Sequence, residues 1–163
     1  MKKIIADHKG QLILSSLVTL LPALAGWRLA WEGAAMLAAH WLVLLITFSD
    51  RRNRENQSRK AVRLIFWIMP AVSLLTGGVT ALLQRGVQSA STLSTAMTMG
   101  FGLLFIVLGN YMPKFRQNSF MGIRVKWTLE SEANWNATHR MGGKVWVAGG
   151  FACLAGAMLP VKA

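Results

Sequence analysis

The chain has 163 residues, of which 53% are hydrophobic and only 15% charged, and 18 Lys and Arg against 6 Asp and Glu give a net charge of +12. A nucleic-acid-binding domain or a disordered chain of that net charge would carry charge throughout and few apolar residues, so the composition excludes both classes. The single cysteine and three scattered histidines exclude an internal disulfide and a zinc-type cluster. Because the charged residues are gathered between long apolar segments, an integral membrane protein remains.

Five apolar segments approach the length of about 20 residues that a helix needs to cross a bilayer. They cover about residues 11–31, 33–49, 61–84, 96–112 and 145–160. The predicted fold is all-α: a single polytopic domain over 1–163, with about five transmembrane helices and a short cytoplasmic interfacial helix. Its cytoplasmic loops are expected at about 50–60 and 113–144, and a tight outer turn is expected around Glu32 and Gly33.

The basic residues predict the orientation, because short loops rich in Lys and Arg stay cytoplasmic. Fifteen of the 18 fall before the first, third and fifth segments, which leaves Arg28, Arg85 and Lys162 on the other side. The fifteen are Lys2, Lys3, Lys9, Arg51, Arg52, Arg54, Arg59, Lys60, Arg63, Lys114, Arg116, Arg124, Lys126, Arg140 and Lys144. We therefore expect a multi-pass protein of the cytoplasmic membrane with its N terminus inside and its C terminus outside.

The N-terminal segment has a second interpretation as a cleavable signal peptide. Lys2 and Lys3 precede an apolar run that ends in the small-residue triplet at 23–25. Apolar residues continue through Trp27 and Trp31, so we expect the helix to be retained.

Small residues in the third and fifth segments predict close helix contacts. Gly77 and Gly78 give the third segment a slim face, and the fifth carries Ala148, Ala152 and Gly156 at four-residue spacing beside the glycines 149 and 150. Such a stripe is typical either of packing within one chain or of a homodimer face, and both remain open.

Ionisable residues inside the apolar segments are nearly absent, which argues against a proton-coupled transporter. His40 is the exception. The expected role of this side chain is a structural hydrogen bond to a backbone carbonyl, Ser or Thr.

The stretch from Lys114 to Lys144 is long for an unstructured connection. Thr128 is a predicted N-cap, acidic residues follow it, and His139 and Arg140 come just before two glycines, which together predict a short helix. On a membrane surface, Trp127 and Trp135 would lie at headgroup level, with Arg124, Lys126 and Arg140 near phosphates.

No catalytic arrangement can be assembled from the sequence. Glu130 or Glu132 with His139 is the one acid and imidazole pairing, and it lacks a nucleophile. An enzyme acting on lipid headgroups through His139 and Glu132 is thus a weak alternative, and we predict a protein without catalytic residues, cofactor or metal.

Residues 109 to 150 resemble the signature of the SdpI family of bacterial membrane proteins. The residues that carry the resemblance are Gly109-Asn110-Tyr111-Met112-Pro113-Lys114, Asn118, Gly122-Ile123-Arg124, Trp127-Thr128-Leu129, Trp135, Thr138-His139-Arg140 and Gly142-Gly143-Lys144.

The resemblance implies a small polytopic membrane protein that confers immunity to a secreted antibacterial toxin and holds a cytoplasmic repressor at the membrane. The expected partners are the lipid bilayer, a toxin, a repressor and a second copy of the chain, with no direct nucleic acid. The candidate partner-binding residues are Asn110, Asn118, Arg124, Trp127, Trp135, Thr138, His139, Arg140 and Lys144. Arg124 and Arg140 are expected to bind an anionic group of the partner, while the tryptophans set the depth.

The chain departs from the family pattern in three places. Val125-Lys126 replaces a typical Thr-Pro, the first outer loop is reduced to a tight turn, and the C terminus is shorter than in many relatives. An alternative function of a different class is a small oligomeric transporter or channel subunit.

Overall fold

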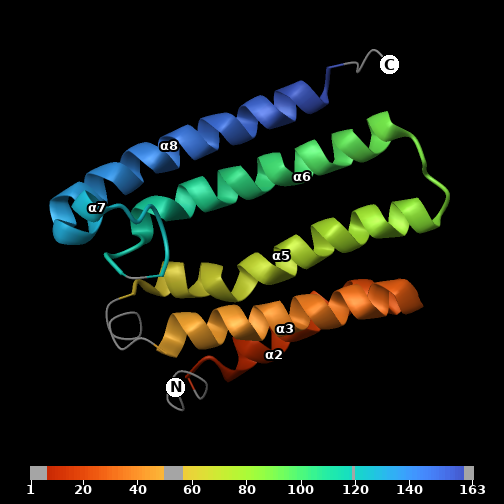
Figure 1. Cartoon of the computed structure of the whole chain (residues 1–163), viewed down its shortest axis with the longest axis horizontal. Coiled ribbons are helices and arrows are strands. Elements are labelled where there is room, and N and C mark those ends of the chain that lie inside the picture. The colour runs from red at the N-terminus through yellow and green to blue at the C-terminus, as the bar shows by residue number, and fades with distance from the viewer. Residues whose placement is uncertain (1–6, 50–56, 119, 160–163) are drawn as a thin grey trace. The chain divides into compact units, whose positions relative to one another are not determined.

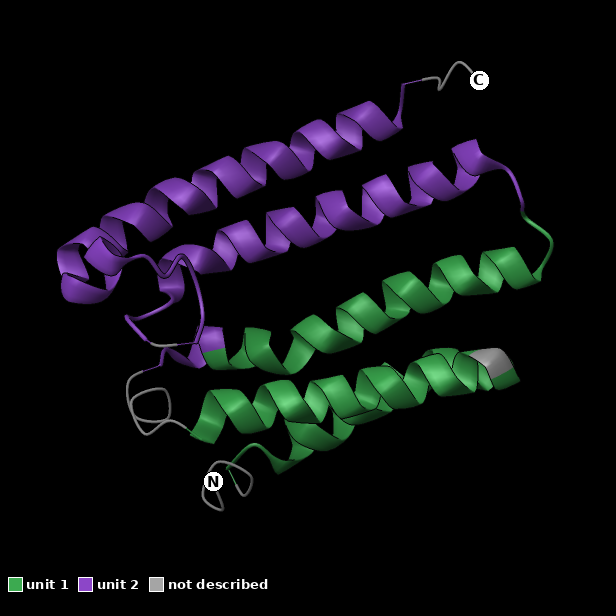
Figure 2. Ribbon diagram, viewed as in Figure 1, with its two compact units in different colours: residues 1–55, 62–87 green, residues 56–61, 88–163 purple. Residues whose placement is uncertain are grey.

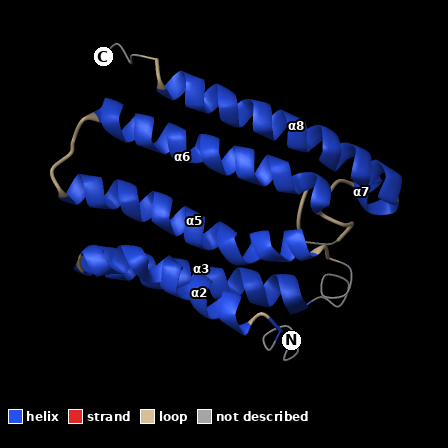
Figure 3. Ribbon diagram, turned by 180° about the vertical axis from the view of Figure 1, so that it is seen from behind, coloured by secondary structure: helices blue, strands red, loops and turns tan. Residues whose placement is uncertain are grey.

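A computed structural model describes residues 7–49, 57–118 and 120–159, and the side chain of Arg28 is outside this description. Within these ranges the chain forms helices and connecting loops without a strand, which confirms the all-α prediction (Figure 3). The chain divides into two compact units, residues 1–55 with 62–87 and residues 56–61 with 88–163 (Figure 2). The single domain predicted for 1–163 stays a prediction.

Unit 1 contains α2 (Lys9–Leu20), the 3-10 turn η1 (Leu21–Ala25), α3 (Trp27–Ser49) and most of α5 (Arg59–Gln84) (Figure 1). The prediction of one helix over 11–31, followed by a turn at Glu32 and Gly33, was wrong: both residues lie inside α3. The break falls instead at Pro22, at the start of η1, and at Gly26 with φ of +153°. Proline at the start of a helical turn and glycine in a conformation that L residues rarely adopt end the first helix earlier.

The interior of unit 1 is polar where three of its helices meet. His40 is fully buried and its Nε2 lies 3.0 Å from Oγ of Ser15, so the predicted hydrogen bond to a Ser or Thr is confirmed. Ser73 on α5 donates its hydroxyl to the carbonyl of Thr19 at 2.8 Å. A Cβ on Gly77 would overlap the ring of Pro22. This glycine therefore permits the close helix contact that the small residues of the third segment predicted.

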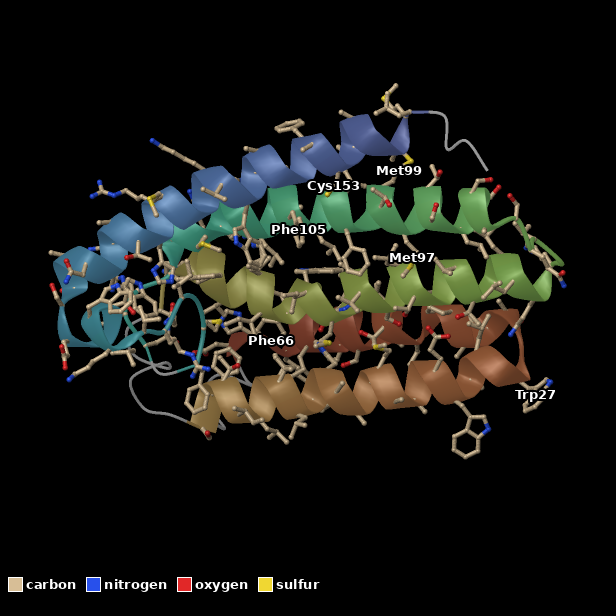
Figure 4. The ribbon with its side chains drawn as sticks, turned by 45° about the horizontal axis from the view of Figure 1, so that its top comes forward. Trp27, Phe66, Met97, Met99, Phe105 and Cys153 are labelled. Atoms are coloured by element: carbon tan, nitrogen blue, oxygen red, sulfur yellow. The ribbon has the colours of Figure 1, made fainter. Side chains whose placement is uncertain are left out.

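Aromatic residues lie at the two ends of unit 1. Phe66 is buried between His8 and Phe48, with ring centroids 5.6 and 6.0 Å away. Trp27 points away from α3 and is 73% exposed (Figure 4). An exposed indole at a helix start is typical of a membrane-interface anchor.

Unit 2 contains α6 (Ala90–Tyr111), η2 (Met112–Lys114), α7 (Lys126–Glu130) and α8 (Glu132–Ala157). The structure corrects the predicted short helix that ends before Gly142, because α8 runs without interruption through both glycines. It also places Thr128 inside α7, while the side chain of Ser131 caps α8 by accepting a hydrogen bond from the amide of Asn134.

Helices α6 and α8 lie side by side and meet at two pairs of glycines (Figure 1). A Cβ on Gly143 would lie 2.6 Å from the carbonyl oxygen of Gly109, and one on Gly150 would lie 2.6 Å from that of Gly102. Each glycine costs about 1 kcal/mol of helix propensity. This close backbone contact explains why α8 continues where the sequence predicted an end.

The predicted small-residue stripe only partly enters this contact. Gly150 is buried against α6, but Ala148, Ala152 and Gly156 are exposed, and a Cβ on Gly149 or Gly156 would meet nothing within 4 Å. Packing within the chain therefore uses a neighbouring face of α8, and the homodimer stays a prediction.

Three described helices are long and apolar enough to cross a membrane: Leu29–Ser49, Arg59–Gln84 and Ala90–Lys114. The apolar stretch Lys9–Ala25 is shorter. These helices indicate a multi-pass membrane protein. The orientation prediction depends partly on Lys2, Lys3, Arg51, Arg52, Arg54 and Lys162, which lie outside the described residues, as does much of the predicted 50–60 loop.

The glycine contact can be tested with two adjacent substitutions. Gly150→Ala forces a methyl group against the backbone of α6, so we expect it to lower the stability of the purified protein by roughly 1–3 kcal/mol. Gly149→Ala meets open space and is the matched control; it should be neutral or stabilising by up to about 1 kcal/mol. Thermal unfolding in mild detergent measures both, and equal midpoints would contradict the contact.

Candidate functional site

The stretch between η2 and α8 folds into a compact loop, residues 115–131, whose turn is organised by Asn118. This side chain is 3% exposed and accepts hydrogen bonds through Oδ1 from the amides of Phe120 and Met121, at 2.8 and 2.6 Å. Its Nδ2 donates to the carbonyl of Arg116 at 2.8 Å. An asparagine that satisfies backbone groups on both sides of a turn holds that turn in one conformation. Asn118 is thus an interior residue, not a contact surface.

Trp135 and His139 of α8 form the base on which this loop lies. Both side chains are fully buried, and their rings stack with centroids 4.0 Å apart. The indole Nε1 of Trp135 donates to the carbonyl of Phe115 at 2.8 Å, which fixes the start of the loop. Trp135 is therefore an interior residue, because the loop folds back over this face of α8, and its expected depth at headgroup level stays a prediction.

The hydrogen bonds of His139 determine its tautomer. Nδ1 lies 2.8 Å from the carbonyl of Trp135, which can only accept, so Nδ1 carries the proton. Nε2 accepts the amide hydrogen of Ile123 at 3.0 Å. A protonated ring would turn Nε2 into a donor facing another donor. The loop therefore requires the neutral ring.

Gly122 lets the loop backbone approach this histidine. Its φ is +97°, and a Cβ there would overlap Nε2 of His139. Glycine meets both the conformational and the steric requirement.

Two polar residues that the candidate set omitted complete the loop. Thr128 is fully buried; its Oγ1 accepts from the amide of Val125 at 3.0 Å and lies 2.9 Å from the carbonyl of Ile123. Gln117 donates to the carbonyls of Thr128 and Leu129, at 2.8 and 2.9 Å. Thr128 belongs to the residue signature described in the sequence analysis. There it was interpreted as a helix N-cap, and not as the hydrogen-bond partner of Val125 and Ile123.

The loop is also tied to the chain just before α5. Ser58 donates its hydroxyl to the carbonyl of Lys114 at 2.8 Å, and Nε2 of Gln57 donates to that of Arg116 at 3.3 Å. These bonds join residues more than 50 positions apart, so no local pattern indicated them. Gln57 and Ser58 accordingly belong to unit 2.

The remaining candidates lie on the outside of unit 2. Trp127 on α7 and Arg124 just before it are exposed. Thr138 is half-buried on α8. Asn110, Arg140 and Lys144 are exposed and line one groove between α6 and α8. The nine predicted residues therefore separate into a buried support (Asn118, Trp135, His139), two exposed sets, and the half-buried Thr138.

The exposed candidate residues carry cationic and aromatic side chains. Arg124, Arg140 and Lys144 offer cationic donors, and Trp127 offers an exposed indole. Both ring nitrogens of His139 are engaged, which removes it from the headgroup-hydrolysis alternative. Within the described ranges, no three His, Cys, Asp or Glu side chains gather into a possible metal site.

The C-terminal third of the chain resembles a known family. Residues 114–163 match the model of the SdpI/YfhL protein family. This segment, which contains α8 and the loop with α7, is therefore similar to that family, as the residue signature predicted.

A named relative is similar over the same part of the chain. Immunity protein SdpI of Bacillus subtilis (strain 168) is 40% identical over 53 residues, which are 32% of this chain and 26% of the relative. The similarity thus spans about a quarter of the relative's length. No solved structure matches the chain.

The neutral His139 predicts a pH-dependent stability. Burial lowers the pKa of this imidazole below its ordinary value of 6.5, partly offset by its hydrogen bond to the carbonyl of Trp135. The unfolded chain then binds more protons than the folded one between the two pKa values. The contribution of His139 to the free energy of unfolding is therefore fully present above about pH 6.5. It falls as the pH drops toward the folded pKa, by at most about 1.4 kcal/mol per pH unit.

Thermal unfolding of the purified protein between pH 8 and pH 5 measures this slope. His139→Gln has no titrating ring, so its midpoint should vary less with pH than that of the wild type. Parallel curves for the two proteins would show that His139 does not carry the effect.

Proposed function

We propose that this chain is an SdpI-type immunity and signalling protein of the cytoplasmic membrane. In this proposal five helical segments cross the bilayer, the N terminus lies inside and the C terminus outside. The alternation of basic and apolar blocks supports this orientation. The fifth crossing, predicted over about 145–160, then includes the second half of α8, while the first half of α8 and the loop lie on the cytoplasmic side.

The observation that carries the proposal is the folded loop over Trp135 and His139. Its interior is built from Asn118, Thr128, Trp135 and His139, and all four lie in the segment that matches the family. Four buried polar or amphipathic side chains in one loop are costly unless each is paired, and here each has hydrogen bonds. Such a structure fixes the exposed residues around it and is typical of a recognition element.

The exposed cations supply the recognition chemistry. Arg124 and Arg140 bind an anionic group of the partner, and Trp127, three residues after Arg124, inserts at headgroup level. A guanidinium can bind carboxylate or phosphate through two parallel hydrogen bonds, which suits a partner recognised at the membrane surface. Toxin protection and retention of a cytoplasmic repressor both require such a surface.

Toxin protection is tested by expressing this chain in Bacillus subtilis that lacks its own SdpI and challenging the cells with the secreted toxin. We expect survival to rise relative to an empty vector. Arg124→Gln should remove at least about tenfold of the protection, since a bidentate charge-assisted contact contributes about 1.5–3 kcal/mol. Lys126→Gln removes an exposed cation two residues away and is the control.

Membrane abundance of each variant is measured by immunoblot. Equal protection by both variants at equal abundance would refute the role of Arg124, and no protection by the wild type would refute the immunity function. Crosslinking in the same cells, followed by mass spectrometry, tests the repressor: a DNA-binding protein should be captured with wild type and lost with Arg124→Gln.

A second candidate, a small oligomeric transporter or channel subunit, is favoured by the polar interior of unit 1. Nε2 of His40 contacts the hydroxyl of Ser15, while its Nδ1 is buried and has no hydrogen-bond partner among the residues that the structure describes. In a Cys153→Ser background, cysteines placed at Ser73, Thr76 and Thr80 test for a water-filled path. Labelling of all three by a water-soluble maleimide would favour the transporter; complete protection would exclude a path along this face.

A further inference from the structure

A groove of about 990 Å³ runs along one side of the α6 and α8 pair, entirely within unit 2. Its volume lies at the upper end of the range of about 300–1,000 Å³ typical of small-molecule sites. The part of α8 that lines it extends from Ala137 to Phe151, and α6 with η2 contributes Gly109, Asn110 and Pro113. Of the residues that line it, only Arg140 has a part in the toxin and repressor contacts proposed above.

The groove exists because the two helices approach closely at one point and lack bulk beside it. Gly143 touches the backbone of Gly109, so the floor there is main chain. Ala137 and Ala148 are exposed and contribute one methyl group each to the wall of α8. Main chain and methyl groups thus form this part of the groove, which suits a slender apolar chain more than a bulky side chain.

One end of the groove is cationic. Arg140 and Lys144 are four residues apart on α8, so their side chains share one face of the helix. Both are exposed, and neither forms an ion pair with a residue of the described chain. Asn110 faces them from α6 and adds an amide that can donate a hydrogen bond.

The other end is apolar. Val147 and Phe151 continue the same face of α8 below the cations, and Phe151 is 59% exposed. A further apolar side chain, Met141, is 67% exposed and lines the groove at its cationic end, next to Arg140. From Arg140 to Phe151 the helix rises about 16 Å, close to the depth of about 15 Å of one leaflet of the hydrocarbon core.

We propose that this groove binds an anionic phospholipid. Arg140, Lys144 and Asn110 hold the phosphate, and one acyl chain lies along Val147 and Phe151. A cationic end followed by an apolar track, which together extend over about the depth of one leaflet, matches the charge distribution of a lipid. A second copy of this chain would bring its own basic residues to the cationic end, which disfavours a homodimer there. Basic pockets between membrane helices bind anionic headgroups by the same chemistry.

Native mass spectrometry of the full chain, purified in mild detergent and titrated with phosphatidylglycerol or phosphatidylcholine, tests the proposal. We expect one phosphatidylglycerol to remain bound and phosphatidylcholine to bind at least tenfold more weakly. The double variant Arg140→Gln with Lys144→Gln should weaken phosphatidylglycerol binding by about 30-fold, since each basic residue near a lipid surface contributes about one kcal/mol. Arg116→Gln with Lys126→Gln removes two exposed cations of the same unit outside the groove and should retain the lipid.

Ala148→Trp probes the apolar track without changing the charge. It fills the groove beside Val147 and should displace the lipid, whereas Ala133→Trp, at an exposed position of α8 that does not line the groove, should not. Equal binding of the two lipids, or equal loss in the groove variants and their controls, would overturn the proposal. So would a protein dimer that the groove variants abolish, because the occupant would then be a second copy. Toxin protection is not part of this readout, so the proposal can fail or stand independently of the immunity function.

Discussion

The backbone contact between α6 and α8 is the constraint on which the rest of unit 2 depends. Gly109 with Gly143, and Gly102 with Gly150, let the two helices approach until a side chain at any of these positions would collide with main chain. The spacing of seven residues on both helices repeats the contact after two turns. Because α8 is held there, its first turns extend beyond the contact and present Trp135 and His139 to the loop. The groove beside Gly143 follows from the same approach.

A second constraint acts near the N-terminal end of α8, at Trp135 and His139. The stacked rings of Trp135 and His139 each direct a nitrogen at loop backbone, and Gly122 gives the loop the freedom to reach the imidazole. Buried polar groups of this kind are stabilising only when every donor and acceptor is paired. The loop therefore has one conformation, and a change in the protonation of a single ring affects several of its contacts. This arrangement separates the supporting residues from Arg124 and Trp127, which the loop exposes.

The helices of unit 1 are held together by small polar residues rather than by glycine contacts alone. Its helices α2, α3 and α5 meet through hydroxyls and one imidazole, so hydrogen bonds between helices accompany apolar packing. Inside a bilayer, small polar residues at helix contacts are typical because apolar side chains gain little by leaving lipid for protein. Gly77 and Pro22 add a close contact in which a proline ring fills the space that a glycine leaves. The break between α2 and α3 thus also supplies a packing surface.

The sequence by itself determined the all-helical class, the positions of α5 and α6, and the resemblance of the C-terminal segment to a known family, because apolar length and an ordered set of unusual residues are local properties. It also indicated that residues 114–144 are structured. The tertiary structure decided the course of α8 through Gly142 and Gly143, since the propensity that predicts an end there is outweighed by contact with α6. It likewise decided that Trp135, His139 and Asn118 are interior while Arg140, Lys144 and Asn110 share a groove. The physical reason is that burial and hydrogen-bond partners depend on residues distant in the chain, such as Ser58 and Lys114, whose proximity no local pattern encodes.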